Sequence, residues 1–156
     1  MNAVKHKIRK PASRVTPDAL SLANQLHSAA IHLLRRLRVR DLACRVGPAQ
    51  LSALSVLVFG GGPRSLGELA DAEQVRPPTM SRIVAGLERR GLVRRRATED
   101  GRRIRLEAAT KGVALIREAR RQRIELLAQA FSSHTEDELQ QLANGARILQ
   151  QIIREL

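Results

Sequence analysis

Apolar residues recur at helical spacing along most of the chain, so the pattern predicts a mainly helical protein. The first helical stretch starts at the segment TPDAL, where Thr16 is a typical helix cap and Pro17 a typical first residue. Its apolar positions then alternate steps of three and four residues: Ala23, Leu26, Ala30, Leu33 and Leu37. This spacing predicts one long amphipathic helix that ends near Cys44.

Three shorter helices follow. The segment PAQLSALSVLVF carries Leu51, Leu54 and Val58 at helical spacing and ends at GGGP. A capping box, Ser followed three residues later by Glu in SLGE, then starts a second short helix. The adjacent prolines of VRPPTM fit only the first turn of a helix, so a third helix starts near Arg76 and ends before Gly91.

After Gly91 the pattern changes from helical to alternating. The segment LVRRRATEDGRRIRL predicts a two-stranded hairpin, because Asp100-Gly101 is a strong turn signal. On the returning strand Ile104 and Leu106 alternate with arginines.

The C-terminal third returns to helical spacing. One helix is marked, less regularly, by Ile116, Ala119, Ile124, Leu127 and Phe131. A capping box of Thr135 and Glu138 starts the last helix. Its stripe repeats every three or four residues: Leu139, Leu142, Ala146, Leu149, Ile153 and Leu156. A monomer would leave the stripes of the first and last helices half exposed, so they predict a dimer, with packing inside one chain as the alternative.

Charge is concentrated in two places. The net charge is +13, and residues 76–105 carry ten basic against three acidic side chains while residues 1–17 carry five basic and none acidic. Two such patches on a nearly neutral body indicate a polyanionic partner, with nucleic acid the first candidate and an anionic membrane surface the second. Phe59 and Phe131 are the only aromatic residues, which favours duplex DNA over base-stacking RNA or single strands.

Other functional classes find little support. The sequence holds no apolar run of membrane-spanning length and starts without the apolar core of a secretion signal, so we expect a cytoplasmic protein. Cys44 is the only cysteine, which excludes an internal disulfide, and we expect it to be a small buried thiol. The four histidines lack metal-ligand spacing, and no phosphate loop or nucleophile motif is present, so we expect neither an enzyme nor a cofactor.

Three short helices followed by a basic hairpin is the element order of a winged helix-turn-helix, in which the second helix of the turn pair enters the major groove. Thr79, Ser81 and Arg82 are then expected to meet base edges, and Arg94, Arg95 and Arg96 to meet phosphates. The full set of expected DNA-binding residues is Arg64, Arg76, Pro78, Thr79, Ser81, Arg82, Arg94, Arg95, Arg96, Asp100, Arg102 and Arg103.

Residues 18–156 resemble the MarR-type transcriptional regulators. The segment LGELADAEQVRPPTMSRIVAGLERRGLVRR is similar to that family's helix-turn-recognition-helix block. Asp100 and Arg102 match its wing signature, in which the aspartate orients an arginine that reaches into the minor groove, and Gly112 falls where the family carries a glycine after the wing. The resemblance implies that role for Arg102, an obligate homodimer built from the first and last two helices, and release of DNA by a small, often aromatic acid.

Two positions depart from the family pattern. Ala108-Ala109 replaces a Leu-Thr pair, with Thr110 as a substitute helix cap one place late. Gln74 stands where a glycine commonly makes the turn between the two helices. Both departures bear on the geometry of the turn and the wing.

We therefore expect four segments: a basic disordered arm (1–15), a dimerisation helix (16–45), a winged helix-turn-helix domain (46–109) and C-terminal dimerisation helices (110–156). The expected function is sequence-specific regulation of transcription by a homodimer on a pseudo-palindromic DNA site, as a repressor relieved by a small aromatic or phenolic effector whose binding residues the sequence does not identify. The alternatives are a non-specific architectural DNA-binding protein without ligand control and a protein-interaction module that no longer binds DNA.

Overall fold

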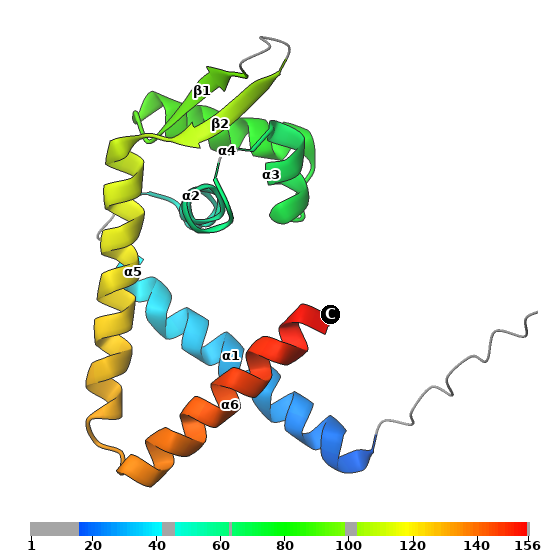
Figure 1. The fold of residues 1–156 in the computed structure, drawn as a ribbon, viewed down its shortest axis with the longest axis vertical. Helices are drawn as coiled ribbons and strands as arrows, with labels where there is room; N and C mark the ends of the chain where they lie inside the picture. Colours follow the sequence, from blue (N-terminus) through cyan, green and yellow to red (C-terminus); the bar gives the residue numbers. More distant parts are fainter. Residues whose placement is uncertain (1–15, 42–45, 63, 99–102, 156) are drawn as a thin grey trace, which may run out of the picture. The chain divides into compact units, whose positions relative to one another are not determined.

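The computed structural model describes residues 16–41, 46–62, 64–98 and 103–155. Within them the chain forms six α-helices and one antiparallel pair of strands (Figure 1), which confirms the mainly helical fold. The chain divides into two compact units, Met1–Arg36 and Leu37–Leu156.

Helix α1, Pro17–Asp41, makes up the described part of the first unit and continues into the second. It starts as predicted, because the Thr16 hydroxyl accepts a hydrogen bond from the Ala19 N–H at 3.2 Å. Most of its large apolar side chains are exposed: Leu20, Leu22, Leu26, Ile31, Leu33 and Leu34. Cys44, near which the helix was expected to end, lies outside the described residues.

Helix α2, Pro48–Phe59, forms the centre of the second unit's core. Helices α3 (Leu66–Ala72), α4 (Pro77–Arg89) and α5 (Thr110–Phe131) all contact it, as does strand β2 (Ile104–Ala108). Because it has neighbours on several sides, its buried residues extend beyond the single predicted stripe: Leu51, Ala53, Leu54 and Leu57. Val58, which the stripe included, is only partly buried.

Helix α3 ends in a reversal that needs a left-handed residue. The Val75 N–H donates to the Ala70 carbonyl at 3.0 Å and the Gln74 N–H to the Asp71 carbonyl at 3.1 Å, which is the Schellman pattern. Gln74 occupies the left-handed position with φ of 53°. The turn therefore forms with Gln74 in place of the glycine that is common in the family.

Helix α4 starts and ends where the sequence predicts. Arg76 is its N-cap with extended backbone, and the two prolines fill its first two positions. Gly91, with φ of 68°, ends it in a second Schellman reversal, in which the Leu92 N–H donates to the Leu87 carbonyl at 3.0 Å.

The hairpin predicted after Gly91 consists of strand β1, Val93–Ala97, paired with β2 so that Val93 lies opposite Ala108 and Ala97 opposite Ile104. Arg64 adds an isolated bridge on the other edge of β2, exchanging two backbone hydrogen bonds with Leu106. Leu106 is buried over the core, whereas Ile104 is 56% exposed near the turn end of the strand.

Helix α5 starts one residue earlier than a Thr110 cap would require, so that expectation is wrong. The N-cap is Ala109, which makes no side-chain capping bond, and Thr110 is the first helical residue. The reason lies in the preceding turn: the Ala109 N–H donates to the Leu92 carbonyl at 2.9 Å, which fixes the chain at that point. One turn on, a Cβ on Gly112 would lie 2.1 Å from the same carbonyl oxygen.

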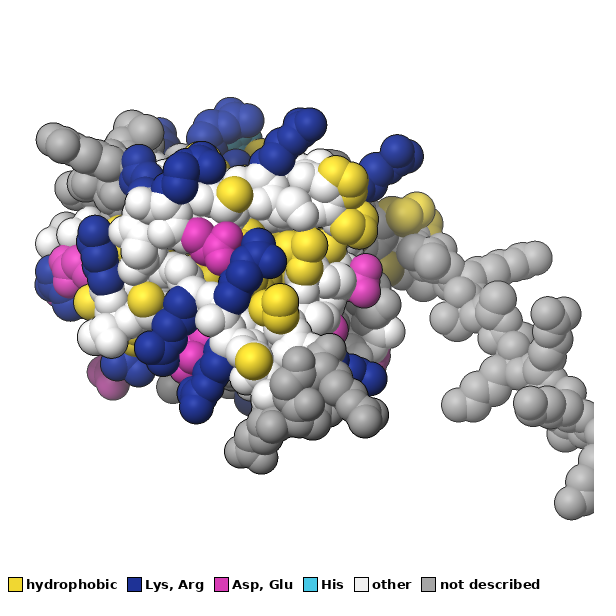
Figure 2. All heavy atoms as spheres, turned by 90° about the horizontal axis from the view of Figure 1, so that it is seen from above, with side chains coloured by type: hydrophobic (Ala, Val, Ile, Leu, Met, Phe, Trp, Pro, Cys, Tyr) yellow, Lys and Arg dark blue, Asp and Glu magenta, His cyan; other side chains and the backbone are white. Residues whose placement is uncertain are grey.

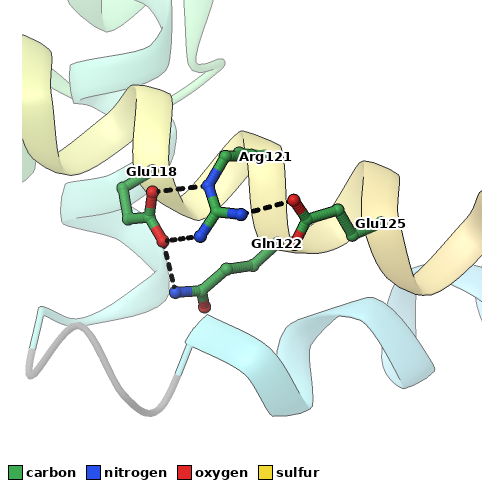
Figure 3. A network of polar contacts seen from close by, with 4 residues as sticks. All are labelled: Glu118, Arg121, Gln122 and Glu125. Atoms are coloured by element: carbon green, nitrogen blue, oxygen red, sulfur yellow. Dashed lines mark hydrogen bonds and ion pairs between the residues drawn. The ribbon is translucent and has the colours of Figure 1, made fainter.

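The exposed side of α5 carries an ion-pair cluster (Figure 3). The Arg121 guanidinium donates to both oxygens of Glu118, at 2.8 and 2.6 Å, and to Glu125, while the Gln122 amide donates to Glu118 at 2.8 Å. These donors lower the pKa of the Glu118 carboxyl to about 2, with Arg121 the larger cause.

Helix α6, Glu136–Glu155, starts at the predicted capping box: the Glu138 N–H donates to the Thr135 hydroxyl at 3.3 Å, and the Thr135 N–H to the Glu138 carboxylate at 2.9 Å. No described residue of α6 is buried. Its exposed large apolar side chains are Leu142, Ile148, Ile152 and Ile153.

Replacing Gln74 by glycine is expected to stabilise the protein by about 0.5–1 kcal/mol, because a Cβ is unfavourable in the left-handed region and the Gln74 side chain is exposed. Thermal melts of the two proteins give the measurement. Gln74→Ala is the control, since it removes the same side chain but keeps the Cβ, and it should give no gain. Equal gains in stability in both variants would show that the Cβ of Gln74 does not strain the backbone.

Candidate nucleic-acid interface

The first three positions of α4 have no free backbone N–H group to offer a ligand. Pro77 and Pro78 have no N–H, and the Thr79 N–H already donates to the Arg76 carbonyl at 2.9 Å. The partial positive charge of the helix end remains. Contacts from this turn to an anion or a base must therefore come from its side chains.

One face of α4 points away from the core. Met80, Val84 and Leu87 are buried on the opposite side, and at 3.6 residues per turn this leaves Pro78 and Arg82 facing outward, where both are exposed. Thr79 is exposed on one flank of this face, and Ser81 is half-buried on the other. The four expected DNA-binding residues of α4 thus lie on one continuous surface.

Sequence reasoning missed Arg89, which extends the same face. It is exposed and stands seven residues after Arg82, two helical turns further along. That spacing was visible in the sequence and could have identified it.

Arg76 and Arg64, two more of the expected DNA-binding residues, differ in exposure and in hydrogen bonding. Arg76 is exposed at the cap of α4. Arg64 is half-buried, its guanidinium donates to the Gly60 carbonyl at the end of α2, and its Nε is buried without a hydrogen-bond partner. Arg64 therefore already stabilises the end of a core helix.

The outer face of the hairpin carries an arginine pair held by one carboxylate. Glu107 lies directly opposite Arg94 in the strand register. Its Oε2 accepts a hydrogen bond from Arg94 Nε at 3.2 Å, and lies 3.1 Å from Arg94 Nη2 and 3.9 Å from Arg96 Nη1. Arg94 and Arg96 are two residues apart and share this face because side chains alternate along a strand.

Arg95 points to the other face and connects the hairpin to α4. Its guanidinium donates twice to Glu88 of α4, with Nε to Oε1 at 2.8 Å and Nη2 to Oε2 at 3.3 Å. This hydrogen-bonded carboxylate raises the pKa of Arg95 above its ordinary value. The two-pronged pair fixes the base of the hairpin against the helix.

Together Arg94, Arg95 and Arg96 line a shallow hollow of about 360 Å³. Viewed from the end that carries α3, α4 and the hairpin, Lys and Arg side chains project over much of the surface, with carboxylates among them (Figure 2). This surface suits a polyanion.

The hairpin closes at Thr98 and Arg103, where the Thr98 N–H donates to the Arg103 carbonyl at 2.8 Å and the Arg103 N–H to the Thr98 hydroxyl at 3.2 Å. Arg103 is exposed beside the turn. Asp100 and Arg102, expected to form the minor-groove pair, lie outside the described residues.

Within the ranges given above, no cluster of His, Cys, Asp and Glu could hold a metal ion. None of the described helices is both long and apolar enough to cross a membrane.

Comparison with known proteins places these features in a family context. Residues 46–104 match the family model described as MarR family. Two HTH-type transcriptional regulators, from Mycobacterium tuberculosis and Mycobacterium leprae, are each 36% identical over 135 residues, covering 86% of this chain and 94% of the relative.

Solved structures show the same fold. A MarR family protein from Bacillus stearothermophilus is 27% identical with a TM-score of 0.79, covering 88% of this chain and 96% of that one. A mutant of MepR from Staphylococcus aureus, solved bound to an oligodeoxyribonucleotide, is 20% identical with a TM-score of 0.64, covering 84% and 97%.

Proposed function

The chain belongs to the MarR family of DNA-binding transcriptional regulators, and from this we propose that it recognises a specific duplex sequence as a homodimer. The observation that carries the proposal is the outward face of α4, where Pro78, Arg82 and Arg89 are exposed in line beside an arginine-rich hairpin. A helix of this kind fits the major groove, and the hairpin then acts as the wing along the DNA backbone.

Two kinds of contact are proposed. Pro78, Thr79, Ser81, Arg82 and Arg89 face base edges. Phosphate contacts come from the exposed cations around them, of which Arg76, Arg94, Arg95, Arg96 and Arg103 are the proposed set. Arg64 has the least support as a DNA contact, because its guanidinium already donates to Gly60.

For the turn of the wing, the family pattern supports a minor-groove role. Arg102 would enter the groove, oriented by Asp100, and would read groove width and A·T content more than individual bases. A mutant of the fold relative MepR was solved bound to an oligodeoxyribonucleotide, which supports DNA binding in general.

The exposed stripes of α1 and α6 support the homodimer. In the α6 stripe Leu142 and Ile153 are exposed and Leu149 is half-buried, and none of the described α6 residues is buried within the protomer, so the stripe is costly to leave in water. A two-fold dimer would place two recognition helices on half-sites about 10 base pairs apart, so the preferred site should be a pseudo-palindrome.

The double substitution Leu149→Glu and Ile153→Glu should yield monomers or insoluble chain, because it puts charge into an apolar seam. Light scattering after size-exclusion chromatography measures the mass. Gln140→Glu with Gln151→Glu adds the same charge on the other side of α6 and should leave the dimer intact. A wild-type monomer in solution would contradict the proposal.

We further propose that the protein is a repressor and that a small aromatic or phenolic acid releases it from DNA. A hollow of about 560 Å³ between α2 and α5 supports this: Phe59 offers an aromatic face, and Arg117 and Arg120 offer cations for a carboxylate. The Arg120 guanidinium lies 5.0 Å from the Phe59 ring centre. Pockets of this size commonly accept small ligands.

Hydroxybenzoates are expected to release the protein from its preferred duplex in a gel-shift titration. Arg120→Gln should raise the concentration needed by about tenfold, the loss of roughly one charged contact. Arg147→Gln, which removes a cation from α6, is the matched control. Release of both variants at the wild-type concentration would show that the acid binds elsewhere.

The alternative is an architectural protein that coats DNA without sequence preference. Affinities for the preferred duplex and for a random duplex, measured at one salt concentration, distinguish this protein from a sequence-specific regulator. Arg82→Ala should cost about 1–3 kcal/mol on the preferred site and relax the preference there, because a base-edge contact is lost. Arg96→Ala should weaken all sequences alike and reduce the salt dependence by about one unit, because a phosphate contact is lost.

Arg147→Ala serves as the control. It removes one charge from α6 and should change neither the sequence preference nor the salt dependence by a comparable amount. If Arg82→Ala, like Arg96→Ala, weakens binding to the preferred and to the random duplex by the same factor, the protein coats DNA and the proposed regulator function fails.

A further inference from the structure

Glu107 is the acidic residue of the wing's outer face whose position the strand pairing fixes. Its side chain is 25% exposed, whereas the two arginines that it contacts, Arg94 and Arg96, are 63% and 72% exposed. Its neighbour Leu106 is buried in the core, lies opposite Arg95 of β1 in the strand register, and exchanges two backbone hydrogen bonds with Arg64 on the other edge. The backbone of Glu107 is therefore fixed by the sheet and its carboxylate is mostly covered, while Arg94 and Arg96 reach into solvent.

One carboxylate oxygen of Glu107 contacts both Arg94 and Arg96. Arg94 is held at 3.1 and 3.2 Å and Arg96 at 3.9 Å, all to Oε2. A phosphate that approaches Arg94 and Arg96 meets these two cations and also the negative charge of Glu107, which stays beside them. An exposed ion pair of this kind is worth about 0–1 kcal/mol, so phosphate can compete for the arginines, but the repulsion from Glu107 remains.

We infer that Glu107 is a specificity-determining residue, which weakens binding to random duplex while orienting Arg94 for the preferred site; the inference rests on the sequence-specific binding proposed above. A guanidinium has five N–H donors, so Arg94 can keep its contact with Glu107 and still donate to a phosphate. At the preferred site, where α4 sets one register, this fixed orientation saves the entropy of ordering a long side chain.

On random duplex the balance is different. Non-specific binding comes almost entirely from phosphate contacts, and the protein moves between registers, so no single orientation of Arg94 is favoured. The fixed negative charge then only reduces the attraction. Removing it should raise affinity for random DNA more than affinity for the preferred site.

The test uses the full chain and the variant Glu107→Gln, which keeps the side chain's shape and removes its charge. The probes are the duplex most enriched in selection from a random-sequence library and a shuffled duplex of the same composition. Affinity for the shuffled duplex should rise on the order of threefold to tenfold, and its salt slope should increase by about one unit. Affinity for the selected duplex should stay within about twofold, so the ratio of the two affinities falls.

Two further variants make the result specific to this position. Glu107→Asp keeps the charge and should retain most of the wild-type preference. Glu118→Gln makes the same charge change on α5, where the carboxylate is also paired with an arginine (Figure 3), and should leave the ratio unchanged. Thermal melts check that all three variants fold.

The outcomes distinguish this inference from the function on which it rests. If the wild type prefers its selected duplex but Glu107→Gln leaves or lowers affinity for the shuffled duplex, the inference is wrong and the regulator function stands. An equal gain in Glu118→Gln also overturns it, because the effect would then be one of net charge. If the wild type shows no preference between the two duplexes, the proposed function itself fails.

Discussion

The placement of both proposed DNA-facing elements depends on one backbone junction, at Leu92. Its N–H closes the end of α4, its side chain is buried in the core, and its carbonyl accepts the Ala109 N–H at the start of α5. Gly112 lets α5 approach that carbonyl more closely than a Cβ would allow. Lys111 adds a bond from its Nζ to the Arg90 carbonyl at 3.2 Å. Helix α4, the hairpin and α5 are therefore fixed to one another within a few residues of Leu92.

The charged surface next to this junction is more neutral than its composition indicates, because its arginines are paired with carboxylates. Arg95 is paired with Glu88, and Arg94 and Arg96 share Glu107, so the wing's arginines are partly neutralised and partly oriented before any DNA arrives. Exposed pairs contribute little to folding stability. Their main consequence is geometric, because an arginine held by a carboxylate loses less side-chain entropy when it binds a phosphate.

Several elements followed from local sequence alone. The capping boxes at the starts of α3 and α6, the prolines of α4 and Gly91 lie where they were predicted, because each acts on hydrogen bonds within a few residues of itself. The Thr110 cap failed because a long-range bond, from Ala109 to Leu92, fixes the chain one residue earlier. Arg89 could have been found from its spacing to Arg82, although the sequence did not show how far the outward face of α4 extends.

The sequence by itself determined the order of elements, the start and end of α4 and the concentration of positive charge, since periodicity, capping and composition are local properties. Only the tertiary structure decided which charges are paired. Glu88 and Arg95 lie on different elements, Glu107 reaches Arg94 across the strand pair, and the Arg64 guanidinium caps α2. Such pairings depend on how the core brings elements together and on strand register, and neither follows from the spacing of residues along one chain.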